Sequence, residues 1–264
     1  MNKKCVYTAV TGGYDKLMQP KVIDKTYDFI CFSNDIHEST VGVWQIKPIP
    51  FSHKDNTRVS RFPKFHPHKL LSEYDFSIYI DANNLILDDF IYRRAEQLYS
   101  EHEMIGSIVH PYRNCVYKEI FDCLYQGSDK TWPLIKSLWL HVRENFPRNI
   151  GLFENNLIFW NHHDSKVVQV LDLFWDIYMS HSHRDQLALR LAYYKNNITP
   201  ALFLPCGEHM GNSEHIKRVD HLKKDCRHNN SRRAITMKKI RIRFIRFILL
   251  LMGYNFTYRK LYSD

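Results

Sequence analysis

The chain has 264 residues, a formal net charge of +9, 44% hydrophobic residues and 14% aromatic residues. This composition excludes disorder over most of the chain, and the length suits one globular domain with a sizeable core plus a tail. The six cysteines form no C-x-x-C pair, and the first residues, MNKKCVYTAV, lack the long apolar stretch of a signal peptide. We therefore expect buried thiols and a reducing, cytoplasmic location.

The positive charge is distributed unevenly along the chain. Residues 217–264 contain 14 Lys and Arg against three Asp, a net charge of +11, which leaves −2 for residues 1–216. The sequence therefore predicts a nearly neutral domain over 1–216 and a basic tail over 217–264. A domain without a basic surface is not expected to bind nucleic acid.

A strand predicted over residues 5–10 opens the domain, and the sequence TGGYDKL follows it. Gly12 and Gly13 lack Cβ atoms, so a turn at this position allows backbone amides to approach a phosphate or a base. The next strands are predicted over residues 28–32 and 44–49.

Residues 58–69, RVSRFPKFHPHK, then collect six basic side chains. Such a run commonly forms a solvated face, and its prolines limit helix formation in its second half. Because it lies shortly before the next strand, a helix and a turn could instead return these cations to a crevice and neutralise a diphosphate there. The six residues are Arg58, Arg61, Lys64, His66, His68 and Lys69.

The most informative segment is YDFSIYIDANNLIL, residues 74–87. Its apolar run over 76–80 predicts a strand covered on both faces, and ligand sites in α/β sheets lie beyond the carboxyl ends of such strands. Asp81 and Asn83 follow this strand and offer the oxygen ligands that Mg²⁺ or Mn²⁺ prefers. The alternative is that Asp81, Asn83 and Asn84 only form a turn through side-chain hydrogen bonds to the backbone.

The middle of the chain continues the alternation of strands and helices. Residues 104–109 predict a strand that precedes Arg113 and a helix, and residues 130–149 predict a helix broken by Pro147. Residues 151–160, GLFENNLIFW, predict a loop and a further strand. The polar residues of this stretch are Glu154, Asn155 and Asn156.

Helical spacing of apolar residues predicts a core helix over residues 165–179. Another helix begins after Ser182 or His183, with Asp185 and Gln186 in its first turn, where the helix dipole favours an acidic residue. These residues either cap the helix or project into the sugar-binding end of the crevice.

The tail contains an amphipathic stretch over residues 237–252. Its continuous apolar run is too short to span a bilayer, so we expect a helix that lies on an anionic membrane surface. The alternative is packing on the domain or on a second subunit; nucleic acid is disfavoured because the apolar face would have no role there. Ile240, Phe244, Phe247 and Leu251 form the expected apolar side, opposite Lys239, Arg243 and Arg246.

Several segments, in this order, resemble GT-A-type glycosyltransferases. They are YTAVTGGYDKL, DFICFSND, RVSRFPKFHPHKLL, IDAN, HPYRNCVYKE, GLFENN and RDQLAL, within about residues 5–205. More narrowly, the chain is similar to a glycosyltransferase family long catalogued as a domain of unknown function and found in bacterial capsule and O-antigen clusters and in plant Golgi proteins. The resemblance implies a single α/β, GT-A-like (Rossmann-like) domain with a mostly parallel central sheet, followed here by the basic amphipathic helix.

The resemblance also implies transfer of a hexose from a nucleoside diphosphate sugar, expected to be UDP-linked, to a saccharide or lipid-linked saccharide in surface polysaccharide synthesis. Such an enzyme would act on the inner face of the cell membrane. The implied metal ligands for Mn²⁺ or Mg²⁺ are Asp81, Asn83 and His209. The implied catalytic residues are Asp185, Glu154 and Gln186, and the implied donor-binding residues are Thr11, Gly12, Gly13, Tyr14, Arg58, Arg61, Lys64, His68, Arg113 and Asn155.

One residue departs from the wider family pattern, because Asn83 stands where other glycosyltransferases have the second Asp of an Asp-x-Asp motif. This departure leaves metal dependence open. Two other classes remain as alternatives: a metal-dependent nucleotide-sugar hydrolase or pyrophosphorylase, and a non-catalytic membrane-associated sugar-binding protein. A hydrolase would be expected to have more carboxylates, and a non-catalytic protein could have lost Asp81, Glu154 and Asp185.

Overall fold

The structure is a computed structural model that describes residues 2–222, 240, 242–245, 247 and 250. Its centre is a sheet with the strand order β3-β4-β2-β1-β5-β8-β7-β9. The strands are β1 (Lys4–Ala9), β2 (Tyr27–Phe32), β3 (Thr40–Val41), β4 (Trp44–Lys47), β5 (Phe76–Ile80), β7 (Ile105–Val109), β8 (Phe153–Trp160) and β9 (Ala201–Leu202). β4, β2, β1 and β5 run parallel, β7 and β9 are also parallel, and β8 is antiparallel to both of its neighbours. The predicted α/β fold with a mostly parallel sheet is thus confirmed.

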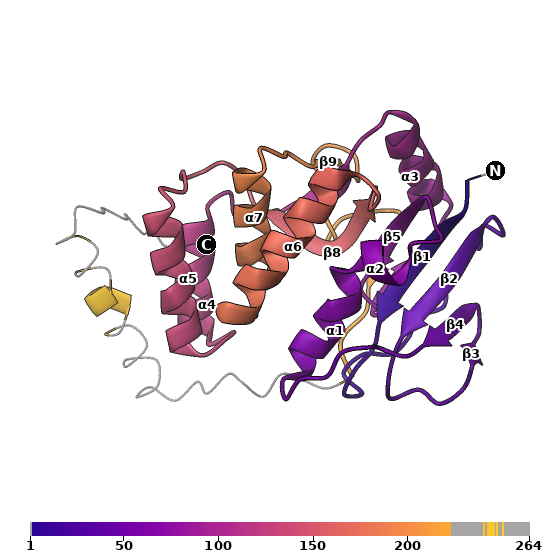
Figure 1. Ribbon diagram of the computed structural model, residues 1–264, viewed down its shortest axis with the longest axis horizontal. Helices are drawn as coiled ribbons and strands as arrows, with labels where there is room; N and C mark the ends of the chain where they lie inside the picture. Colours follow the sequence, from indigo (N-terminus) through magenta and orange to yellow (C-terminus); the bar gives the residue numbers. More distant parts are fainter. Residues whose placement is uncertain (1, 223–239, 241, 246, 248–249, 251–264) are drawn as a thin grey trace.

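Helices cover the sheet and extend one side of it (Figure 1). α1, α2 and the helices α4–α7 share one apolar cluster on one face of the sheet. α3 packs against a second cluster on the other face. The helices are α1 (Asn56–Lys64), α2 (Pro67–Leu70), α3 (Phe90–Ser100), α4 (Val116–Gln126), α5 (Thr131–Arg143), α6 (Ser165–Ser180) and α7 (Asp185–Lys195).

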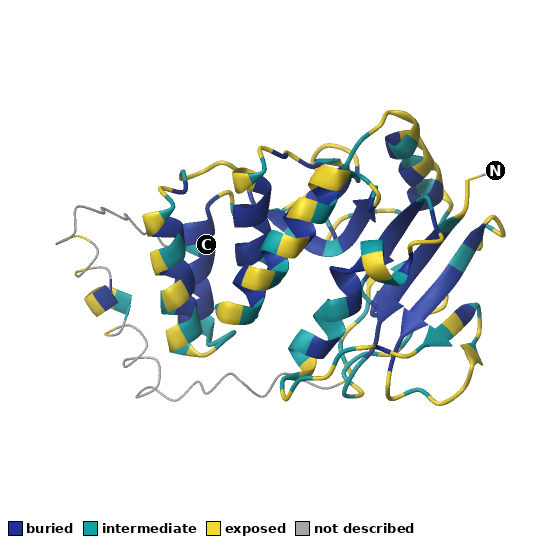
Figure 2. Ribbon diagram, in the orientation of Figure 1, coloured by how far each residue is buried: buried dark blue, intermediate teal, exposed yellow. Residues whose placement is uncertain are grey.

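The core consists of two apolar clusters, one on each face of the sheet. In β5 all five residues are buried, with Tyr79 in the cluster beneath α4–α7 and Ile78 in the cluster beneath α3. This is the strand covered on both faces that the sequence predicted, and Figure 2 shows the buried strands between the helical layers.

Two prolines decide where the basic run turns. Pro63 lies in the last turn of α1 and Pro67 occupies the first turn of α2, so the segment is divided at Phe65 and His66. Proline removes a backbone donor and fixes φ, which favours a break at this position. The N-terminal part of the run is therefore helical, as α1.

Some elements differ from the sequence prediction in extent. α5 ends at Arg143, before Pro147, so the proline follows the helix and does not break it. A second sheet of two antiparallel strands, β6 (Asn84–Ile86) and β10 (Ile216–Arg218), forms beside the main one. β10 crosses the predicted boundary between residues 216 and 217.

The described residues of the tail are helical at 240, 242–245, 247 and 250, whereas Lys239, Arg246 and Leu251 lie outside the described residues. Ile245 is buried and Ile242 packs against the core, while Ile240, Phe244, Phe247 and Leu250 are exposed. Arg243 is exposed as well. Within the described part of the chain, no helix has the length and apolarity needed to cross a membrane.

Candidate active site

A cleft of about 590 Å³ lies at the carboxyl ends of β1 and β5. β1 has β2 on one side and β5 on the other, so the strand order reverses at β1. Ligands commonly bind at such a point of an α/β sheet. Twelve of the residues predicted from sequence line the cleft. They are Thr11, Gly12, Tyr14, Arg61, Lys64, Asp81, Asn83, Arg113, Glu154, Asn155, Asp185 and Gln186.

A buried lysine occupies the centre of this cleft. The Lys64 side chain is 1% exposed, and its Nζ lies 3.4 Å from Asp81 Oδ1 and 3.1 Å from Asp185 Oδ2. Asp185 Oδ2 also accepts a hydrogen bond from Arg61 Nε at 3.1 Å, and Asp81 Oδ1 accepts one from Tyr79 OH at 2.7 Å. Lys64 thereby joins the end of α1, the end of β5 and the start of α7.

These contacts fix the charge of both carboxylates. Burial opposes the ionisation of Asp185, but the charges of Lys64 and Arg61 outweigh burial and hold its pKa well below the usual range. Burial also opposes the ionisation of Asp81, and Lys64 and Arg61 again lower its pKa. Both side chains are therefore carboxylates of low basicity at neutral pH.

Glu154 has the opposite electrostatic character. It lies on β8, and its Oε2 accepts a hydrogen bond from the Met210 amide at 3.1 Å. Burial raises the pKa of Glu154 and outweighs that hydrogen bond and the nearby positive charges of His209 and Arg218. Of the two carboxylates considered as a general base, Glu154 is the one with the higher proton affinity.

Carboxamide oxygens beside Asp81 provide a test of whether a metal ion fits. Asn84 Oδ1 and Asn156 Oδ1 are buried, line the cleft and accept no hydrogen bond. The backbones of these residues are joined to Asp81, since Asn156 O accepts from the Asp81 amide at 2.9 Å and Asp81 O accepts from the Asn84 amide at 2.9 Å, and all three residues line the cleft. Oxygens without a hydrogen-bond donor in the same cleft as a carboxylate suit Mg²⁺ or Mn²⁺. No group of three or more His, Cys, Asp or Glu arranged for a metal ion occurs among the described residues, so other ligands would have to come from the substrate.

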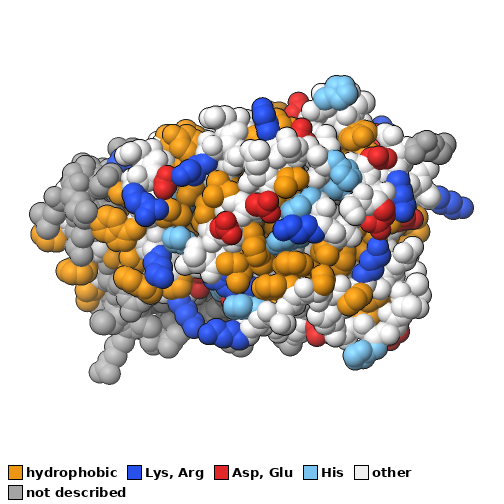
Figure 3. Space-filling view, viewed as in Figure 1, with side chains coloured by type: hydrophobic (Ala, Val, Ile, Leu, Met, Phe, Trp, Pro, Cys, Tyr) orange, Lys and Arg blue, Asp and Glu red, His pale blue; other side chains and the backbone are white. Residues whose placement is uncertain are grey.

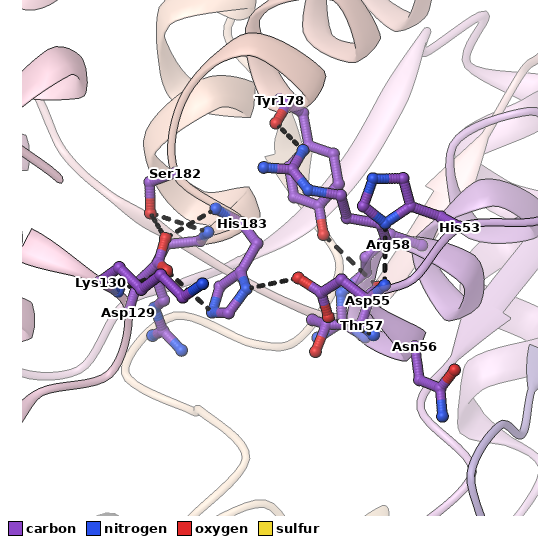
Figure 4. A network of polar contacts seen from close by, with 12 residues as sticks. His53, Asp55, Asn56, Thr57, Arg58, Asp129, Lys130, Tyr178, Ser182 and His183 are labelled. Carbon is purple, nitrogen blue, oxygen red and sulfur yellow. Dashed lines mark hydrogen bonds and ion pairs between the residues drawn. The ribbon is translucent and has the colours of Figure 1, made fainter. Parts of the chain in front are cut away.

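A network of polar contacts holds one wall of the cleft together (Figure 4). Asp55 caps α1 by accepting from the Thr57 amide at 2.9 Å, and its other oxygen lies 3.1 Å from His183 Nδ1. The backbone amide of His183 donates to Asp129 Oδ2 at 3.0 Å, and Ser182 Oγ donates to the same oxygen at 2.7 Å. The start of α1, the α4–α5 loop and the segment before α7 are thus joined to one another.

Arginines at the far end of the cleft are also paired. Arg113 contacts Glu119 at 2.7 Å and Asp122 at 2.6 Å, and both carboxylates are almost fully buried. Arg184 lies 3.4 Å from Glu119 and donates to Gln186 Oε1 at 3.2 Å. These pairs give this end of the cleft a fixed geometry.

Four residues predicted for the site do not line the cleft. Arg58 donates to the backbone oxygens of Tyr178 and, at 3.0 Å, His181, so it anchors the end of α6. His68 lies 3.7 Å from Asp172 beyond the proline break, and His209 accepts from the Gly211 amide at 3.0 Å. The fourth is Gly13.

Other cleft residues were not predicted as site residues from the sequence. His183 was considered only as a helix cap, and Asp15, Asn84, Asn156, Arg218 and His221 were not assigned. Asn84 and Asn156 could have been predicted, since each is next to a predicted site residue in the sequence. Arg218 and His221 could not, because they belong to a segment that is distant in sequence from the other site residues.

Comparison with known proteins gives one family match. Residues 2–128 match the family described as "TOD1/MUCI70, glycosyltransferase-like domain". This part of the chain, just under half of its length, is similar to a glycosyltransferase-like domain. The resemblance to GT-A-type glycosyltransferases is thereby confirmed, and the matched region includes β1, β5, Asp81 and Arg113.

Solved structures with a related arrangement include mouse xyloside xylosyltransferase 1 in its apo form, with 11% identity, a TM-score of 0.43, and coverage of 78% of this chain and 85% of that one. The apo structure of the WbbM bifunctional glycosyltransferase shows 12% identity and a TM-score of 0.42, covering 92% of this chain and 44% of that one. A comparison with curated protein sequences gave no significant match.

Replacing Lys64 with Met should destabilise the protein by about 3–5 kcal/mol at pH 7, because it leaves two carboxylates in the cleft without their shared partner. The folded-state pKa values of Asp81 and Asp185 lie below their unfolded values, so the stability they contribute is present above about pH 4 and is lost as the pH falls. The difference in the free energy of unfolding between wild type and Lys64→Met should therefore become smaller below about pH 4. Urea unfolding at several pH values measures this difference, and Lys69→Met, at an exposed position, is the control. A loss of equal size in both variants would contradict the pairing of Lys64 with Asp81 and Asp185.

Replacing Asp55 with Ala should cost about 1–2 kcal/mol, because it removes the cap of α1 and the contact with His183. The hydrogen bond with His183 holds the pKa of Asp55 well below its usual range, so this stability is present above about pH 4 and is lost on acidification. Urea unfolding at pH 7 and in acid measures the effect. Asp164→Ala, which removes the cap of α6, is the matched control: it should cost about 1 kcal/mol, because it loses a cap alone. An equal loss in both variants would contradict a contribution from the His183 contact.

Proposed function

We propose that the protein transfers a sugar from a UDP-linked nucleotide sugar to a hydroxyl of a saccharide or lipid-linked saccharide, in surface polysaccharide synthesis. The observation that carries the proposal is Asp81, held by Lys64 at the carboxyl end of β5 within a glycosyltransferase-like domain. The family implies a nucleotide-sugar donor and a saccharide acceptor.

The charge of the cleft supports a diphosphate that arrives with a divalent cation. Its lining contains five Lys and Arg and five Asp and Glu, so the cleft is formally neutral apart from histidines. Most of these cations are paired with carboxylates and do not offer a net positive charge. A donor with two negative charges is therefore best accommodated together with Mg²⁺ or Mn²⁺.

The residues that would hold this ion are Asp81, Asn84 and Asn156, together with oxygens of the donor diphosphate. When bound, it would supply Lewis-acid stabilisation of the negative charge that develops on the leaving diphosphate. His209, which does not line the cleft, is not part of this ligand set.

In the proposed reaction the bond between the anomeric carbon and the diphosphate oxygen breaks, and a bond from the acceptor oxygen to that carbon forms. Glu154 accepts the proton of the acceptor hydroxyl, a role that its raised pKa supports. Asp185, held ionised by Lys64 and Arg61, orients the donor sugar with Gln186 from the start of α7. Both lie in the lining of the cleft.

The tail supports a second element of the proposal, attachment to the cytoplasmic face of the cell membrane. Ile240, Phe244, Phe247 and Leu250 are more than half exposed, while Ile245 turns inwards. Basic residues predominate in this part of the sequence, and the combination suits an anionic bilayer surface. One face of the domain differs, since Figure 3 shows acidic and basic side chains interspersed over it.

Nucleotide binding tests the first element. In the presence of Mn²⁺, UDP or a UDP-sugar at about a hundred times its Kd should raise the melting temperature of the wild type by about 5 °C, because binding stabilises the native state by mass action. Asp81→Ala should lose this shift, while the control Asp89→Ala, at the exposed start of α3, should retain it. Absence of a metal-dependent shift with any nucleoside diphosphate would contradict the proposed donor, and formation of free sugar without transfer to any acceptor would favour a hydrolase.

Vesicle binding tests the second element. The full chain should cosediment with vesicles containing phosphatidylserine and should bind at least about tenfold more weakly to neutral phosphatidylcholine vesicles. Replacing Phe244 and Phe247 with Ser should abolish cosedimentation, because both rings are exposed. Trp132→Ser, at an exposed position on α5, is the control and should cosediment like the wild type. Equal binding of all variants would contradict a membrane role for the tail.

A further inference from the structure

A segment near the end of the described chain crosses the rim of the cleft. Residues 215–222, here called the strap, include β10 and pair with β6. The Leu87 amide donates to His215 O at 2.9 Å, and the Leu222 amide donates to Tyr14 O at 3.1 Å. The strap is thus tied to the end of β6 at one end and to the loop after β1 at the other.

Asn83 makes two hydrogen bonds with the middle of the strap. The Val219 amide donates to Asn83 O at 2.9 Å, and Asn83 Nδ2 donates to Val219 O at 2.8 Å. Asn83 is 4% exposed, so the second bond is shielded from water. An aspartate at this position has no N–H to donate and would place a carboxylate against the carbonyl oxygen. This contact provides a physical reason for Asn where the wider motif has Asp.

The strap brings two side chains to the cleft, Arg218 and His221. His221 Nδ1 lies 2.5 Å from Asp15 Oδ1, and the His221 ring lies 4.5 Å from the Tyr14 ring. Arg218 differs from Arg61, Lys64, Arg113 and Arg184, because no carboxylate of the described chain lies within ion-pair distance of it. Its charge acts on Glu154 only from beyond that distance. A guanidinium in a cleft without a close carboxylate is a suitable partner for a phosphate.

We propose that Asn83 is a positioning residue that latches the strap across the cleft, so that Arg218 faces the diphosphate of the bound donor. The identity of that ligand rests on the proposed function, whereas the latch does not. Asn83 then acts through Val219 and does not replace a metal-ligating aspartate. If Asn83 replaces a metal-ligating aspartate, Asn83→Asp should tighten Mn²⁺ binding. If Asn83 holds the strap, the same substitution should loosen the strap and should not tighten Mn²⁺ binding.

Hydrogen exchange of the ligand-free full chain tests the latch. Asn83→Asp should accelerate amide exchange in residues 215–222 by about fivefold or more, because it removes a buried hydrogen bond and leaves Val219 O unsatisfied. It should not tighten the binding of Mn²⁺ measured alone by calorimetry. Asn196→Asp is the matched control, since Asn196 Nδ2 also donates to a backbone oxygen, Ala192 O at 2.9 Å, but away from the strap; its strap exchange should equal that of the wild type. Unchanged exchange in Asn83→Asp together with tighter Mn²⁺ binding would overturn the latch.

UDP binding in the presence of Mn²⁺ tests what the strap carries. Arg218→Ala should weaken UDP binding by about tenfold with unchanged strap exchange, because it removes a charge-assisted contact without touching Asn83. Lys217→Ala, at an exposed position beside it, is the control. Normal UDP binding by Arg218→Ala would overturn the assignment of Arg218 to the diphosphate. Failure of the wild type to bind any nucleoside diphosphate would overturn that assignment and the proposed donor together, while the exchange result would still decide the latch.

Discussion

The contacts of Lys64 with Asp81 and Asp185 are the interaction on which the rest of the site depends. A lysine ammonium that is almost completely buried must be paired, because removal of an unpaired charge from water costs several kcal/mol. Both of its partners are carboxylates at element ends, one after β5 and one at the start of α7. The ammonium therefore fixes the helical layer against the sheet and sets the position of the two carboxylates in the cleft.

The same pairing extends along the cleft. Arg61, Arg113 and Arg184 each contact a carboxylate, so the cleft is held rigid by ion pairs but has little net charge of its own. Such a site does not attract anions in general. It suits a ligand that brings its own counter-ion, and the metal-bound diphosphate that we propose is such a ligand. In that proposal Arg218 of the strap is the cation that contacts the diphosphate.

The basic run at residues 58–69 shows why sequence alone could not assign the site. Arg58, Arg61 and Lys64 lie on the same helix, yet Arg58 contacts the end of α6, whereas Arg61 and Lys64 reach Asp185. The proline break then directs His68 to Asp172, outside the cleft lining. Which cation enters the cleft depends on the rotation of α1 against its neighbours, and composition carries no information about that rotation.

The sequence by itself determined the buried strand before Asp81, the extent of the core helix at α6, the uneven distribution of charge along the chain, and the resemblance to glycosyltransferases. These features follow from the residues themselves and from near neighbours in the chain, through periodicity and composition. The tertiary structure decided that Asp185 shares Lys64 with Asp81, that His183 contacts Asp55 and that Asn83 holds Val219. Such contacts join residues more than 100 positions apart, and only the order and direction of the strands bring those residues together.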